Sequence, residues 1–138
     1  MSARLQVDIS VRLHDAYRRS DYEAAGAVAR IGRRSPDIDA LLLRLGVRQG
    51  GFVGAWNPFS RRMPQGWNDR MLARLCEAAG RLPQAEGSGG NGPWREHHLL
   101  LAGDPRRLAV LARRFRQAAI VTLRRGAPAR LVLLRPAP

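Results

Sequence analysis

A short polar and aromatic segment in the middle of the chain carries side chains that could bind a ligand. Trp56 ends the apolar run 52–56, which we expect to be a strand, and Asn57 and Ser60 follow it. Ligand sites in layered α/β domains commonly lie where a strand ends. An aromatic face, an amide and a hydroxyl suit a planar ligand such as a nucleobase. Asn68 follows at the predicted start of a helix, whose N-terminal amides favour anions. The alternative is that Asn57 and Ser60 fix a turn while Trp56 fills the core.

Three further residues are candidates for the same pocket. Glu96 follows Trp94 and leads into an apolar segment, so partial burial could raise its pKa and make it an acid–base catalyst. A salt bridge between Glu96 and one of the many arginines is the favoured alternative. Gln117, at the end of the last predicted helix, is either a site residue or a hydrogen-bonding partner for the helix end. The pocket hypothesis requires all seven residues to converge, and Glu96 is its only catalytic candidate.

Metal and cofactor chemistry is not predicted. His97 and His98 are adjacent, so in a strand their side chains point to opposite faces. His14 is distant in sequence, and no acidic cluster accompanies the histidines. Cys76 is the only cysteine, which excludes an internal disulfide and a cysteine metal cluster.

The charge balance suggests a second hypothesis. The chain has 24 basic residues, all of them arginine, against 11 acidic ones, a formal net charge of +13. Codon bias in a GC-rich genome explains arginine in place of lysine, but it does not explain the excess of positive charge. The alternative function is therefore a nucleic-acid or ribosome-associated module. Its candidate contacts lie on the polar side of one predicted helix: Arg106, Arg107, Arg113 and Arg114.

Length and composition favour one globular domain spanning residues 1–138. The chain has 138 residues, of which 45% are hydrophobic, enough for one core. Its apolar runs are too short to span a bilayer, and the start of the chain has no signal-peptide core. We therefore expect a cytoplasmic protein without a membrane partner. Residues 1–8 and the glycine-rich segment 86–93 are predicted to be flexible.

Hydrophobic periodicity and turn signals predict alternating helices and strands. Segment 9–19 is interpreted as a helix, although alternation over residues 5–13 also fits a strand. The other predicted helices begin at the Ser35-Pro36 and Asp104-Pro105 pairs and at Asn68 or Asp69. The predicted strands are 22–31, 52–56, 98–102, 118–123 and 131–134, the last two forming a C-terminal hairpin. The expected fold is α+β (layered α/β), with one small sheet of about four to five strands and flanking helices.

Several of these segments resemble a known family in their order and spacing. The segments are Ala55–Ser60 with Asn68, Trp94-Arg95-Glu96, Leu111–Ala119, and the early Ala16-Tyr17 and Tyr22. Together they are similar to the bacterial domain-of-unknown-function family 3293. The resemblance implies one domain and supplies candidate positions, but it brings no activity. The choice between a small-molecule site, a nucleic-acid module and a protein-interaction module stays open at this point.

Overall fold

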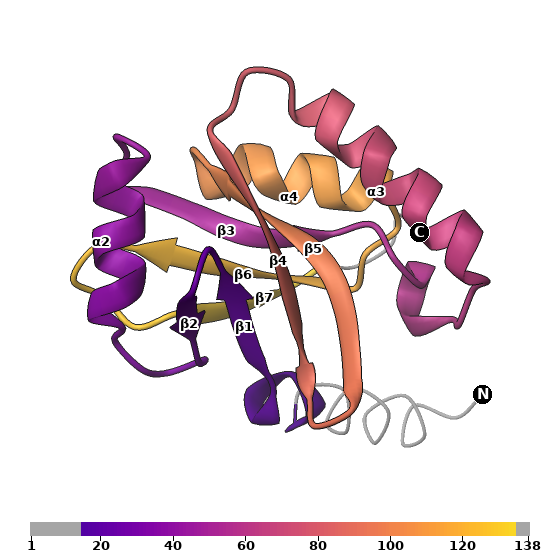
Figure 1. Cartoon of the computed structure of the whole chain (residues 1–138), viewed down its shortest axis with the longest axis horizontal. Helices are drawn as coiled ribbons and strands as arrows, with labels where there is room; N and C mark the ends of the chain where they lie inside the picture. The colour runs from indigo at the N-terminus through magenta and orange to yellow at the C-terminus, as the bar shows by residue number, and fades with distance from the viewer. Residues whose placement is uncertain (1–14, 135–138) are drawn as a thin grey trace.

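The computed structural model describes residues 15–134 and contains one antiparallel sheet of seven strands in the order β2-β1-β4-β5-β3-β6-β7 (Figure 1). The strands are β1 (Asp21–Ala24), β2 (Ala27–Ala29), β3 (Gln49–Gly54), β4 (Gln84–Asn91), β5 (Trp94–Ala102), β6 (Ala119–Arg124) and β7 (Arg130–Leu133). The mixed helix-and-strand fold and the C-terminal hairpin β6–β7 are confirmed. The predicted number of four to five strands is wrong. The ambiguous segment before residue 15, including residues 1–8, lies outside the described residues.

The sheet curls into a half-barrel because its two edges meet at one end. Ile31, just after β2, forms a parallel bridge with Ala129, just before β7. Hydrogen bonds from the Gly32 amide to the Ala129 carbonyl and from the Ala129 amide to the Arg33 carbonyl fasten this contact.

Helices cover both faces of the sheet. The helix α2 (Pro36–Arg44) packs on one face, together with Phe52, Leu100 and Val121. We call this the inner face. The helices α3 (Gln65–Ala79) and α4 (Pro105–Arg114) pack side by side on the outer face, which Val53 and Leu99 help to form (Figure 1). None of the helices in the described part of the chain is both long and apolar enough to span a membrane.

The predicted starts of two helices are confirmed, and the third is corrected. Ser35 and Asp104 cap α2 and α4 through their side chains, each followed by proline, which is pre-shaped for the first helical position. The helix α3 begins at Gln65, so Asn68 lies inside its first turn rather than at its cap. This position buries the Asn68 side chain, where its amide takes part in the site instead of capping the helix.

Two segments differ from their predicted structure. Segment 22–31, predicted as one strand, is the hairpin β1–β2 turning at Ala25-Gly26. Segment 86–93, predicted as a flexible loop, forms most of β4 and its turn into β5. A Cβ on Gly87 would collide with the Glu23 backbone, and one on Gly90 would collide with the Trp94 backbone. The glycines therefore allow close approach of neighbouring strands and do not make the segment flexible.

Candidate functional site

A cavity of about 290 Å³ opens on the inner face, lined by residues of the helical turn 15–19 and of β1, β3, β4, β5 and β6. Glu96, His98 and Leu100 alternate along β5 and therefore share one face. Leu100 joins the core under α2, whereas Glu96 and His98 line the cavity. The cavity is thus the part of the barrel interior that α2 leaves unfilled, a common location for ligands.

Three aromatic rings form one side of the cavity, and a glycine makes room for them. The ring centroids of Phe52 and His98 lie 4.8 Å apart, and those of Tyr22 and His98 lie 6.1 Å apart in a stacked arrangement. Gly89 is paired with both Tyr22 and Glu96 in neighbouring strands. A Cβ on Gly89 would lie 2.8 Å from the Tyr22 and His98 rings. The missing side chain therefore allows both rings to lie over β4.

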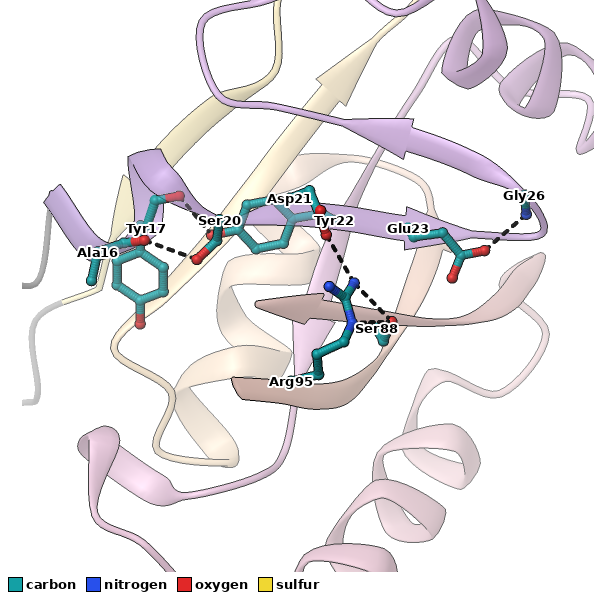
Figure 2. Close-up of polar contacts among 9 residues, drawn as sticks. All are labelled: Ala16, Tyr17, Ser20, Asp21, Tyr22, Glu23, Gly26, Ser88 and Arg95. Atoms are coloured by element: carbon teal, nitrogen blue, oxygen red, sulfur yellow. Dashed lines mark hydrogen bonds and ion pairs between the residues drawn. The ribbon is translucent and has the colours of Figure 1, made fainter. Parts of the chain in front are cut away.

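The Tyr22 ring also fixes the segment that borders the cavity on the N-terminal side. Its hydroxyl donates to the Tyr17 carbonyl at 3.1 Å (Figure 2). On the other face of the same strands, Arg95 reaches across to Asp21 at 2.8 Å and to Ser88 (Figure 2). These contacts hold the helical turn 15–19 and the strands β1, β4 and β5 in register around the opening.

A buried pair of amides orients the central residue of the predicted motif. The Asn57 backbone amide donates to Asn68 Oδ1, and Asn68 Nδ2 donates to Asn57 Oδ1, both at 3.1 Å. The Met63 amide donates to the same Asn57 oxygen at 2.9 Å. With its oxygen held from two sides, Asn57 presents Nδ2 to Glu96 Oε1 at 2.5 Å. Asn68 is thus a positioning residue behind the cavity, not one of its lining residues.

The turn that carries Asn57 is held in an unusual backbone conformation. Asn57, Phe59 and Ser60 have φ values of 47°, 49° and 64°, and left-handed backbone costs non-glycine residues roughly 1 kcal/mol or more each. The Phe59 amide donates to the Arg116 carbonyl at 2.7 Å. Gln117 Nε2 donates to the Trp56 carbonyl at 3.0 Å. The end of α4 therefore holds the strained turn in place.

Glu96 is half-buried and has an amide partner rather than an arginine partner. Within residues 15–134 the ion pairs are Arg95–Asp21 and Arg106–Asp104, so Glu96 forms no salt bridge with a described arginine. Burial raises the pKa of Glu96 above its usual value, and the hydrogen bond from Asn57 partly opposes this. Burial, assisted by the Glu96 charge, also raises the pKa of Tyr17.

Two polar nitrogen atoms at the cavity lack partners among the described residues. Trp56 Nε1 and His98 Nε2 are buried without a hydrogen bond, and both residues line the cavity. Burial lowers the pKa of His98 to about 4, so its imidazole is neutral near pH 7. Unsatisfied buried polar groups are uncommon and costly, so these atoms indicate where a ligand could supply hydrogen bonds.

The structure brings together six of the seven predicted site residues around this cavity: Trp56, Asn57, Ser60, Trp94, Glu96 and Gln117. Trp94 is 55% exposed and lies at the rim, where the Arg62 guanidinium sits 5.7 Å from its ring centroid. The sequence interpretation missed Tyr17, Tyr22 and His98 as lining residues. Alternation from Glu96 would have pointed to His98, whereas no local signal links the tyrosines to the motif.

The arginines proposed for nucleic-acid contact are exposed on α4. Exposed arginines also occur on α2, on the opposite face of the sheet, and on α3. Positive charge is therefore spread over both faces. Within the described ranges, no three His, Cys, Asp or Glu side chains gather closely enough to hold a metal ion.

Comparison with known proteins identifies the segment that carries most of this site. Residues 53–120, about half of the chain, match the model of the family described as "Protein of unknown function (DUF3293)". The match spans the strained turn, the buried amide pair, Glu96 and Gln117. Comparisons with curated proteins and with solved structures found no match. The predicted resemblance is thereby confirmed: through residues 53–120, this chain belongs to the DUF3293 family.

Proposed function

We propose that this protein is a small-molecule-binding domain whose cavity takes a compact, partly planar organic ligand. The observation that carries the proposal is the half-buried carboxylate of Glu96 beside the buried Trp56 Nε1, which has no hydrogen-bond partner within residues 15–134, at the same cavity. Tyrosine, phenylalanine and tryptophan rings supply apolar surface, and the few polar atoms can fix the orientation of the ligand. This is the usual composition of a ligand site. Glu96 is the acid–base candidate that the sequence indicated, and we assign no reaction. We also propose a cytoplasmic location, supported by the single cysteine.

The strained turn supports the proposal independently. Backbone strain persists only where the surroundings enforce it, and it is common at binding sites. Here it places Asn57 between Asn68 and Glu96. A turn needed only to connect β3 to α3 would not have to direct the Asn57 side chain at Glu96.

Native mass spectrometry of the full chain, purified at low salt without nuclease, tests the proposal. We expect a discrete small-mass adduct on the wild-type protein. Ala119 lines the cavity from β6, so an Ala119→Phe variant should lose the adduct by filling the space. Ala73 is exposed on α3, and Ala73→Phe is the matched control that should retain it. Retention of the adduct by both variants would place the ligand elsewhere and contradict the proposal.

The arginine surface supports a second candidate, a nucleic-acid-binding module. Of the exposed arginines in the described residues, Arg95 and Arg106 form the ion pairs seen, so much of the positive charge is uncompensated. Binding through phosphates would weaken steeply with salt. Heterogeneous nucleic acid that is stripped by salt, and lost when Arg107, Arg113 and Arg114 are changed to glutamine, would favour this candidate over the cavity.

A further inference from the structure

Among residues 15–134, Glu96 has no cationic partner, although the protein is rich in cations. The chain has 24 arginines for 11 acidic residues, so an arginine partner would be easy to supply. Among the residues described, the hydrogen bond to Glu96 comes from Asn57 and reaches only Oε1. A partly buried carboxylate without a countercharge is costly. The second oxygen of Glu96 therefore remains available to a group that enters the cavity.

The surroundings of Glu96 suit a positively charged group. Five aromatic residues line the same cavity: Tyr17, Tyr22, Phe52, Trp56 and Trp94. Aromatic faces attract cations, and the attraction is stronger when water is excluded. Arg62 is the only arginine that lines the cavity within residues 15–134, and its guanidinium stacks on the exposed Trp94 ring at the rim. The interior next to Glu96 thus combines a carboxylate with electron-rich rings.

We propose that the ligand carries a protonated nitrogen group of the amidinium or alkylammonium class, which pairs with Glu96 while the aromatic rings contact its apolar part. This inference rests on the proposed small-molecule function and names the substrate class of the same cavity. Asn57 is a positioning residue in it, because its amide holds Glu96 Oε1 and leaves Oε2 to pair with the ligand. Gln117 and Trp56 Nε1 add an acceptor and a donor for the rest of the ligand.

The test compares three probes of nearly equal shape on the full chain by calorimetry and by NMR of the tryptophan indole signals. The probes are benzamidine, a cation; benzamide, its neutral counterpart; and benzoate, an anion. Charge-assisted hydrogen bonds contribute about 1.5–3 kcal/mol, so benzamidine should bind roughly tenfold to a hundredfold more tightly than benzamide. Benzoate should bind more weakly than either.

Two matched variants test whether the preference for benzamidine over benzamide depends on Glu96. Glu96→Gln keeps the acceptor for Asn57 and should reduce the affinity for benzamidine to that for benzamide. Glu77 is exposed on α3, so Glu77→Gln removes the same charge away from the cavity and should preserve the preference. A preference for benzamidine that survives in Glu96→Gln, or equal binding of all three probes, would overturn the inference.

The outcomes also separate this inference from the proposed function. If benzamide or benzoate binds as tightly as benzamidine and Ala119→Phe blocks that binding, the cavity is a ligand site but not one for cations. If no probe perturbs Trp56 and the wild-type protein carries no Ala119-sensitive adduct, both the cation class and the small-molecule function are wrong.

Discussion

Replacing Gly89 with alanine gives opposite results for the two interpretations of the glycine-rich segment. In a flexible loop, alanine would restrict the unfolded chain and stabilise the fold by about 0.4–1 kcal/mol. In the structure, Gly89 is a buried residue of β4. Its added Cβ would lie 2.8 Å from atoms of the Tyr22 and His98 rings. The substitution should therefore destabilise the protein.

The size of the effect follows from how little the two rings can move. Tyr22 and His98 are each 7% exposed, they stack on one another, and the Tyr22 hydroxyl is tied to Tyr17. Overpacking of this kind costs about 1–3 kcal/mol. Because the same rings line the cavity, Gly89→Ala should also weaken ligand binding.

Urea unfolding of the full chain measures this free energy through the denaturation midpoint. Gly66 in α3 is the control, because its added Cβ would meet only the Arg70 side-chain tip at 3.6 Å. Gly66→Ala should stabilise the protein by roughly 0.5–1 kcal/mol, since glycine disfavours helix. A Gly89→Ala variant as stable as wild type would show that the two rings do not pack over β4, and would refute the description of the cavity wall.

Three further predictions test the site and its supports. Asn68→Ala leaves the Asn57 backbone amide without its buried partner and should lower the free energy of unfolding by about 1–3 kcal/mol. Asn91→Ala, at an exposed position, should have little effect, and equal urea midpoints for the two variants would argue against the amide pair. Burial lowers the pKa of His98 from 6.5 in the unfolded chain to about 4 in the folded protein. Between these pH values the unfolded state binds a proton that the folded state does not, so the free energy of unfolding should fall by roughly 3 kcal/mol as the pH drops from 6.5 to 4. An equally steep fall in a His98→Phe variant would assign the pH dependence to other groups. Leu75→Ala empties a fully buried position between α3 and the sheet and should cost about 2–5 kcal/mol, against less than about 0.5 kcal/mol for Leu43→Ala on the exposed side of α2.

The local signals in the sequence determined the elements whose structure depends on neighbours in the chain. Ser35 and Asp104 predict helix starts because capping and proline geometry act within one turn. The apolar run 98–102 predicts a buried strand for a similar reason. The same local chemistry singled out Trp56, Asn57, Glu96 and their companions as polar or aromatic residues at element ends.

The tertiary structure alone decided how these residues meet. The local sequence around Gly89 predicts a loop, but Gly89 lies in strand β4. Rings from β1 and β5 occupy the space that a side chain at this position would take. Asn68 is read as a helix cap, but it lies inside α3 because Asn57, eleven positions earlier, supplies its partner. Tyr22 reaches the cavity because strand pairing places β1 beside β4, and Tyr17 joins it through its hydrogen bond with the Tyr22 hydroxyl. These outcomes depend on contacts between distant segments, which residue type and local periodicity do not encode.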